Sequence, residues 1–245
     1  MKIGIFADSH YCKEETLCFT RKPSLSLVKI KEMLAFFKKE SVDLCLCLGD
    51  VIDKFREKSE ALKYILRIKD EINSSGIPYL AIQGNHDCNN FSAAEFYALM
   101  STPSLPFVYE TETHNFVFID GNYRSSGRSF YEEGVEWTDS NVPRDQVEFL
   151  KISLDKSEKP CVVVLHENLD PTVQKDHIVK NAEEIRCIAE QSGKVDLVLQ
   201  GHYHSGSDTT LNDIRYVTVP AMCEGKENRF IILDLNTMQI HRYSI

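Results

Sequence analysis

Acidic, amide and imidazole side chains stand directly after five short apolar runs of this sequence. They form the clusters Asp8-Ser9-His10, Gly49-Asp50-Val51-Ile52-Asp53, Gly84-Asn85-His86-Asp87, the single His166, and Gly201-His202-Tyr203-His204. Asp, Asn and His side chains without a thiolate suit borderline or hard metal ions such as Mn, Fe or Zn. Two such ions, roughly 3.5–4 Å apart, can clamp a phosphoryl group and activate a hydroxide for in-line attack. These residue types therefore indicate a two-metal hydrolase of phosphate compounds.

The spacing within the clusters favours convergence on common points. Asp8 and His10 are two residues apart, as are His202 and His204, and in an extended segment residues i and i+2 point the same way. A glycine directly before Asp50 allows a sharp turn and a close approach to a bound ion. One carboxylate would hold the two ions together, and Asp50 is the natural candidate. With so few anionic ligands the cluster stays net positive, which favours a phosphate group in the pocket.

The elements that must position these clusters alternate between apolar runs and amphipathic stretches. The runs are Ile3–Ala7, Leu44–Leu48, Tyr79–Ile82, Cys161–Leu165 and Val195–Leu199. Their lack of polar alternation is typical of strands that are buried on both faces. Helical stripes lie at residues 27–37, 61–72 and 179–189, which implies right-handed crossovers and a largely parallel sheet. We therefore expect all five polar clusters at one edge of that sheet, where ligands bind in open α/β folds.

The remaining segments indicate paired strands and one long loop. Residues 104–123 favour a hairpin or a pair of strands, and the segments 216–219, 230–233 and 239–243 have the same antiparallel texture. These strands could form a second sheet or extend the first. Residues 121–142 are expected to form a surface loop, and long loops inside compact domains are often functional. Because the sequence contains no repeat and no Pro/Ser-rich linker, we predict a single domain over residues 1–245.

Composition narrows the classes of partner and location. The net charge of −9 argues against nucleic acid as a partner, because that task needs a basic footprint. The sequence contains no uninterrupted apolar run of about 18 residues, so we expect no membrane span. The N-terminal residues become polar too soon for a signal peptide. The eight cysteines include no C-x-x-C pair, which indicates reduced thiols in a cytoplasmic protein. The sequence does not indicate an oligomeric state.

Taken in order, the five clusters resemble the calcineurin-like metallophosphoesterase family, whose pattern is D-x-H, G-D-x-x-D, G-N-H-D/E, a lone H and G-H-x-H. Every element is present between Asp8 and His204, which is most of the chain. The resemblance implies an α/β fold, a four-layer αββα sandwich of two mixed β-sheets flanked by helices. It also implies a dinuclear metal-dependent phosphohydrolase. The chain looks most like the branch with cyclic-nucleotide phosphodiesterases and manganese-dependent ADP-ribose/CDP-alcohol diphosphatases.

The resemblance implies a role for each matching residue. The first metal ion would be bound by Asp8, His10 and His204. The second would be bound by Asn85, His166 and His202, and Asp50 would bind both ions. His86 would lie beside the substrate, where it stabilises charge or protonates the leaving oxygen. Asp53 would orient His86, and Asn85 would contact the substrate as well as a metal ion.

Cations near the motifs have two interpretations. Lys54 directly follows the motif that ends in Asp53, and phosphate sites often recruit a cation, so Lys54 is a candidate for substrate binding. Solvated surface charge is the commoner role, and we expect it for Arg21, Lys22 and Arg56 as well as for Lys54.

Aromatic residues and histidines outside the motifs are expected to have ordinary roles. Trp137 and Tyr131 could stack on a substrate base, although packing is the commoner role. The remaining histidines, expected on the surface or in packing roles, are His114, His177 and His241. A lid over the site would have to come from residues 11–24, 88–106 or 121–142.

The leading hypothesis is hydrolysis of a small phosphodiester or nucleoside-diphosphate derivative, so that the partner is a small, nucleotide-like phosphate compound. A phosphomonoesterase or phosphoprotein phosphatase is the alternative enzyme. It is disfavoured because Lys54 stands where phosphoprotein phosphatases carry an arginine, and Asp87 replaces their usual glutamate. A non-catalytic protein-binding scaffold is the alternative from another class. Such scaffolds lose ligands or the catalytic histidine, whereas all seven ligand candidates and His86 are present here.

Overall fold

The first of two large sheets contains the strands nearest to both ends of the chain. The computed structural model describes all residues 1–245. The sheet order is β13 (Gln239–Ser244), β12 (Arg229–Asp234), β1 (Lys2–Phe6), β2 (Leu44–Cys47) and β3 (Tyr79–Ala81). β1, β2 and β3 run parallel, while β12 pairs antiparallel with β1 and with β13. The carboxyl ends of the three parallel strands therefore face the same way.

The second sheet contains the middle of the chain. Its order is β10 (Ser207–Leu211), β11 (Ile214–Thr218), β9 (Val195–Gln200), β8 (Cys161–Val164), β5 (Asn115–Phe118) and β4 (Phe107–Glu110). The four inner strands are parallel, and the edge strands β4 and β10 are antiparallel to their neighbours. Both sheets are thus mixed.

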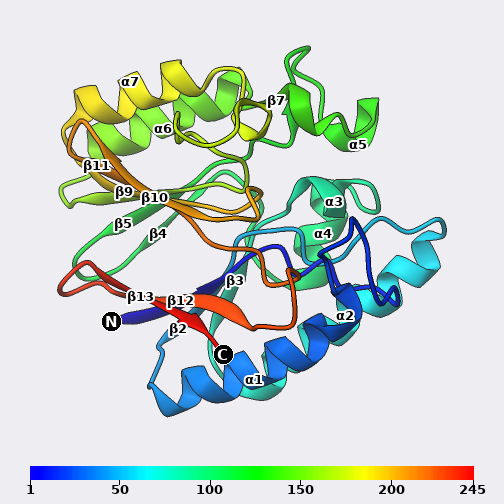
Figure 1. Cartoon of the computed structure of the whole chain (residues 1–245). Helices are drawn as coiled ribbons and strands as arrows, with labels where there is room; N and C mark the ends of the chain where they lie inside the picture. Colours follow the sequence, from blue (N-terminus) through cyan, green and yellow to red (C-terminus); the bar gives the residue numbers. More distant parts are fainter.

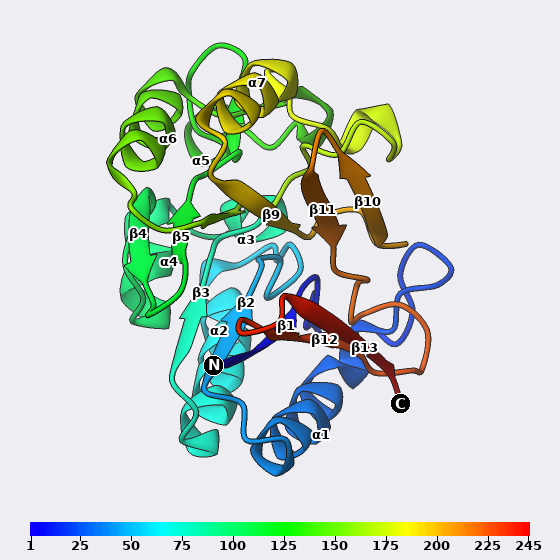
Figure 2. The ribbon, with the colours of Figure 1, turned by 90° about the vertical axis from the view of Figure 1, so that its left-hand side faces the viewer.

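Helices cover the outer face of each sheet, which gives four layers (Figure 1). α1 (Ser26–Lys39), α2 (Lys58–Ser75) and α4 (Ala93–Met100) pack on the first sheet. α6 (Arg144–Lys156) and α7 (Ala182–Ser192) pack on the second. Each helix buries an apolar stripe, such as Ile65, Ile68 and Ile72 in α2, as the periodicity predicted. Figure 2 shows the same layering after a quarter turn.

The two sheets share one core of 19 buried apolar side chains. Ile3 and Ile5 of β1 face this core, while Phe6 faces the helices, as the two-residue period of a strand requires. A β-carbon at Gly4 would collide with the Phe37 ring of α1, so this glycine permits the close helix–sheet contact. The shared core supports the prediction of a single domain, which stays a prediction.

The structure confirms the five apolar runs as strands but divides them between two sheets. The prediction of one largely parallel sheet was wrong, because the chain leaves the first sheet after β3 and begins the second with β4 and β5. Apolar runs show which residues are buried and do not show which strands are neighbours. The four-layer architecture that the resemblance implied is confirmed. No helix combines the length and apolar character needed to cross a membrane.

Two smaller expectations need correction. The segment 216–219 was expected to have antiparallel neighbours, and its strand β11 is antiparallel to β10 on one side but parallel to β9 on the other. The expected surface loop 121–142 contains short elements: β6 (Tyr123–Arg124), α5 (Phe130–Glu133), the 3-10 turn η2 (Trp137–Asp139) and β7 (Ser140–Asn141). β6 and β7 pair with each other, so the segment that contains Trp137 begins and ends at one two-stranded sheet.

Candidate active site

The polar clusters of all five predicted strands meet at one end of the two sheets. Asp8 follows β1, and Asp50 follows β2, while Asn85 begins the short helix α3 (Asn85–Cys88) after β3. His166 follows β8 and His202 follows β9 of the other sheet. Because both sheets direct the carboxyl ends of these strands to the same end of the molecule, the expected convergence holds although the strands belong to different sheets.

The residues predicted to hold the first metal ion lie within a few ångströms of each other. The Nε2 atoms of His10 and His204 are 3.2 Å apart. Asp8 Oδ1 lies 3.9 Å from His10 Nε2 and 3.7 Å from His204 Nε2. Two ring nitrogens and a carboxylate that point at one spot form a donor set that suits a divalent ion.

The residues predicted to hold the second ion form a similar group. His166 Nε2 lies 3.2 Å from Asn85 Oδ1 and 3.5 Å from Asp50 Oδ2. The ligand atoms of Asp50, His166 and His202 lie within 4.8 Å of one another, and the buried His202 Nε2 has no partner in the chain. An orphaned ring nitrogen beside a carboxylate fits a bound cation.

Asp50 belongs to both groups. Its Oδ2 atom is 3.4 Å from His10 Nε2 in the first group and 3.5 Å from His166 Nε2 in the second. Burial alone would raise the pKa of Asp50, but the charges of His166 and His86 outweigh it and hold that pKa well below its usual range. An ionised carboxylate between two imidazole groups has the position and charge of a bridging ligand. The seven residues thus fit two ions, and their individual ligand roles stay predictions.

Backbone strain is concentrated at these residues. Asp8, His10, Asp50 and His202 have φ values of 55°, 44°, 50° and 64°, in the left-handed region that costs a non-glycine residue about 1 kcal/mol or more. Backbone hydrogen bonds hold the conformation: Asp8 N–H donates to Gly49 O at 3.1 Å, and His10 N–H donates to Asp50 O at 2.9 Å. Such strain is typical of functional sites.

Asp87 joins the loops that follow β2 and β3. Its carboxylate accepts backbone N–H bonds from Val51 at 3.2 Å, Ile52 at 3.1 Å and Gly84 at 3.0 Å. A β-carbon at Gly84 would collide with the backbone nitrogen and carboxylate of Asp50. Asp87 therefore has a structural role: it holds the loop that carries Asp50 against the loop that carries Asn85.

His86 and Asp53 form the pair that the sequence predicted. His86 Nδ1 lies 2.8 Å from Asp53 Oδ1, and the His86 side chain is 26% exposed toward the cavity, compared with 10% for Asp53. Burial tends to lower the pKa of His86, but the carboxylates of Asp50 and Asp53 outweigh it and raise that pKa. The histidine can therefore carry a proton at the cavity surface, while its roles in catalysis and substrate binding stay predictions.

Glu224 is a residue of this site that sequence reasoning missed. Its Oε1 atom lies 2.7 Å from His204 Nδ1, and this hydrogen bond lowers the pKa of Glu224 to about 2. A carboxylate on Nδ1 leaves Nε2 of the ring free for a metal ion. The buried Lys29 holds this loop, since its Nζ donates to Met222 O at 2.6 Å and Gly225 O at 3.0 Å. No motif surrounds Glu224, so nothing local in the sequence could reveal it.

The Glu224→Ala variant is expected to bind Mn²⁺ about 10–100-fold more weakly than the unmodified chain, because its His204 ring loses the partner that orients it. Mn²⁺ titration by calorimetry, with circular dichroism as a check on folding, measures this effect. Glu227→Ala is the matched control, since Glu227 lies three residues away and its side chain is largely exposed. Equal affinity of both variants for Mn²⁺ would remove Glu224 from the site.

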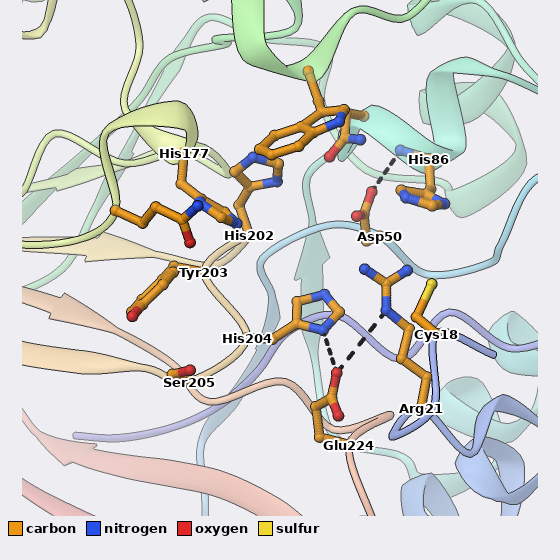
Figure 3. Close-up of a pocket in the computed structure, with 13 residues that line it drawn as sticks. Cys18, Arg21, Asp50, His86, His177, His202, Tyr203, His204, Ser205 and Glu224 are labelled. Carbon is orange, nitrogen blue, oxygen red and sulfur yellow. Dashed lines mark hydrogen bonds and ion pairs between the residues drawn. The ribbon is translucent and has the colours of Figure 1, made fainter. Parts of the chain in front are cut away.

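The clusters open into a cavity of about 360 Å³, which is shown in Figure 3. Five of its lining residues were predicted site residues: Asp50, Asn85, His86, His202 and His204. The others are Cys18, Arg21, Trp137, Gln174, His177, Tyr203, Ser205 and Glu224. Of the expected lid segments, 11–24 and 121–142 contribute lining residues and 88–106 contributes none. Gln174 and His177 were not expected there; they directly precede and end the 3-10 turn η3 (Lys175–His177).

Several side chains were expected elsewhere or in other roles. Lys54 is exposed and does not line the cavity; only its backbone N–H reaches the site, donating to Asp53 Oδ1 at 2.7 Å. Its substrate-binding role therefore gains no support. Arg21 was expected to be a solvated surface charge, and Trp137 and His177 were expected to pack or lie on the surface, but all three line the cavity. Arg21 and Trp137 lie in two of the segments from which a lid was expected, whereas His177 lies in none of them.

Comparisons with known proteins agree with this geometry. The model of the calcineurin-like phosphoesterase family matches residues 1–206. A protein described as a probable cyclic nucleotide phosphodiesterase from Psychrobacter arcticus is 24% identical over 206 residues, which cover 79% of this chain and 67% of that protein.

Solved structures show the same fold. The crystal structure of a dimetal phosphatase from Danio rerio is similar with a TM-score of 0.77, at 16% identity over 94% of both chains. That of a protein from Thermus thermophilus has a TM-score of 0.65, at 12% identity over 99% of this chain and 98% of the other. The fold, the five converging clusters and the match over residues 1–206 lead to one conclusion. The chain belongs to the calcineurin-like phosphoesterase family and is a metal-dependent hydrolase of phosphoester bonds.

Proposed function

We propose that the chain hydrolyses a small phosphodiester or nucleoside-diphosphate derivative with the help of two metal ions. One observation carries the proposal: Asp50 Oδ2 lies within 3.5 Å of an imidazole nitrogen from each of the two ligand groups, beside a cavity that His86 also lines. The similarity to a probable cyclic nucleotide phosphodiesterase supports a diester substrate. A cavity of about 360 Å³ lies at the small end of the range for ligand pockets.

In this proposal the two ligand groups bind one ion each. Asp8, His10 and His204 hold the first and Asn85, His166 and His202 the second, with Asp50 shared by both. Bound ions supply positive charge that polarises the phosphoryl oxygens and lowers the pKa of the attacking water. Nitrogen and oxygen donors suit Mn, Fe or Zn. Burial, followed by the charge of His166, lowers the pKa of His202, which keeps the ring in the neutral form that metals require.

His86 acts on the leaving oxygen. Asp53 accepts a hydrogen bond from His86 Nδ1, which fixes the ring and leaves Nε2 as the atom that donates a proton to the leaving group. The backbone N–H of His86 donates to Asp50 Oδ1 at 2.7 Å, so the acid and the shared carboxylate keep a fixed relation. A positioned acid of this kind contributes about 10²–10⁴-fold to the rate.

The surroundings suit a small anionic substrate. The chain carries a net charge of −9, but Arg21 and His86, whose pKa is raised, line the cavity beside the groups that would hold two cations. With those ions bound, a phosphate is attracted to the cavity and not to the general surface. We also keep the proposal of a cytoplasmic protein, which rests on eight cysteines that are all free thiols, as is usual in reducing compartments.

A substrate panel tests the proposed function. The purified chain, loaded with Mn²⁺, Fe²⁺ or Zn²⁺, is expected to hydrolyse aryl phosphodiesters and at least one of cyclic AMP, ADP-ribose and CDP-glycerol faster than a phosphopeptide. Faster hydrolysis of the phosphopeptide or of aryl monoesters would favour the monoesterase alternative. A chain that binds no metal and hydrolyses none of these compounds would instead be a protein-binding scaffold of the same fold.

A further inference from the structure

Arg21 places a cation in the active-site cavity. It lies in the segment between β1 and α1, where its backbone exchanges two hydrogen bonds with Leu17, of 3.0 and 3.1 Å, and forms a bridge to Glu224. Lys22 N–H also donates to Cys223 O at 2.6 Å. These contacts fix the segment against the loop that carries Glu224. Figure 3 shows the guanidinium group directed into the cavity, toward Asp50.

The N–H donors of the Arg21 guanidinium group form no hydrogen bond within the chain. Its nearest acidic oxygen is Glu224 Oε1, 3.9 Å from Arg21 Nε, and the same oxygen already bonds His204 Nδ1 at 2.7 Å. Arg21 is the only Lys or Arg that lines the cavity, and its side chain is only 20% exposed. An arginine presents five N–H donors in a planar fork that matches a phosphate. A partly buried arginine without a hydrogen-bonded partner is therefore ready to bind an anion.

The opposite side of the cavity is aromatic. The ring centroids of Trp137 and His177 are 5.0 Å apart, and Trp137 is 5.8 Å from His202. His177 lies 5.1 Å from Tyr203. In Figure 3, His177 and His202 lie across the cavity from His86, while Arg21 lies below Asp50 in the same half of the cavity as His86. Trp137 is 37% exposed, so part of its surface is free to contact a flat group such as a nucleobase.

We propose that Arg21 binds a second phosphate, next to the one that is cleaved, and that Trp137 with His177 stacks on a nucleobase, so that the substrate is a nucleoside-diphosphate derivative. The inference rests on the proposed function and chooses between its two substrate classes. His86 marks the side from which the leaving group departs, and a cation on that side favours a leaving group that is itself a phosphate.

The reaction is then hydrolysis of a phosphoanhydride. An oxygen of water bonds to the nucleoside phosphorus, the bond from that phosphorus to the bridging oxygen breaks, and the electron pair stays on the bridging oxygen of the leaving phosphate. His86 gives its proton to the bridging oxygen as that oxygen leaves. One proton of the water stays on the newly formed nucleoside phosphate or dissociates from it, and the other returns through solvent to His86. The products are a nucleoside monophosphate and a phosphate monoester. Arg21 compensates the charge that accumulates on the leaving phosphate.

Two matched substrates test the role of Arg21. The p-nitrophenyl esters of thymidine 5′-monophosphate and thymidine 5′-diphosphate share the base and the aryl group and differ by one phosphate. The ratio of kcat/KM for the diphosphate ester to that for the monophosphate ester is expected to fall roughly 10–100-fold in Arg21→Ala, the effect of losing a hydrogen-bonded charge. Arg21→Lys should restore part of this ratio, because it returns the charge without the fork. Arg56→Ala is the matched control, since the Arg56 side chain is 96% exposed and outside the cavity.

Trp137 is tested with a substrate that lacks the nucleoside. In Trp137→Ala the KM for the thymidine monophosphate ester is expected to rise about tenfold or more relative to that for methyl p-nitrophenyl phosphate, while Trp137→Phe keeps most of the difference. Metal content and thermal unfolding are recorded for every variant, because Arg21 lies near Glu224.

The outcomes separate the two proposals. If the unmodified chain hydrolyses neither thymidine ester, the proposed function fails. If it hydrolyses them and Arg21→Ala slows both esters equally, Arg21 binds the cleaved phosphate and the present inference is overturned. The inference is also overturned if Arg21→Ala changes neither this ratio of kcat/KM nor the rates. It is likewise overturned if Trp137→Ala has the same KM values for the thymidine monophosphate ester and for methyl p-nitrophenyl phosphate as the unmodified chain.

Discussion

Replacing His86 with alanine is expected to lower kcat about 10²–10⁴-fold while two metal ions remain bound. The reason is geometric: Nδ1 of His86 is held by Asp53 at 2.8 Å, so the ring presents its other nitrogen to the substrate. The loss should be larger for alkyl esters than for p-nitrophenyl esters, because an alkoxide needs a proton to leave and a nitrophenolate does not. Steady-state kinetics with both ester types, together with metal analysis, measures the effect.

The metal analysis is the decisive part of that experiment. The ligand atoms of His10, Asp50 and His86 lie within 4.8 Å of one another, which is close enough for His86 to be a metal ligand instead of a proton donor. Loss of one metal ion from His86→Ala would make this histidine a ligand and refute its role as an acid. His241→Ala serves as the control, because His241 is exposed on β13, outside the cavity lining, and should change neither rate nor metal content.

Much of the site could be predicted because its information is local. Each ligand candidate stands directly after an apolar strand, and the chain direction of parallel strands brings their carboxyl ends together. The extended backbone from which the pairing of Asp8 with His10 and of His202 with His204 was predicted is not present, because Asp8, His10 and His202 have left-handed φ values. His202 and His204 also lie in different predicted ligand groups, so their spacing alone did not place them. The predicted meeting of the polar clusters is correct although the prediction of one sheet was wrong. β1–β3 and β8–β9 belong to different sheets, but their carboxyl ends lie at the same end of the molecule.

The parts that could not be predicted depend on contacts between distant segments. Glu224 reaches His204 because the buried Lys29, far earlier in the chain, binds the carbonyl groups of its loop. Arg21 enters the cavity because its segment pairs with that same loop. Neither residue has a neighbour in sequence that marks it. The left-handed backbone at Asp8, His10, Asp50 and His202 is equally invisible, because glycine precedes only two of these residues.

Asp50→Asn is expected to have the largest effect of any single change on metal binding. The asparagine keeps the size of the side chain and an oxygen that can accept the His86 N–H bond of 2.7 Å. It removes the one negative charge that both ligand groups share, since Asp50 Oδ2 is 3.4 Å from His10 Nε2 and 3.5 Å from His166 Nε2. Both ions should therefore bind more weakly, and the fold should persist because the packing is unchanged.

Asp50→Asn should also lose activity, because weaker metal binding removes the positive charge that stabilises the transition state. Metal ions supply several kcal/mol of transition-state stabilisation, and several kcal/mol corresponds to a turnover roughly 10³-fold lower. Titration of the apo protein with Mn²⁺ counts the ions and gives their affinities, and p-nitrophenyl ester kinetics gives the rate. Asp155→Asn, on the exposed side of α6, should match the unmodified chain in both measurements. If Asp50→Asn still binds two ions with unchanged affinity, Asp50 is not the shared ligand, and the two histidine groups must be held together by something other than its carboxylate.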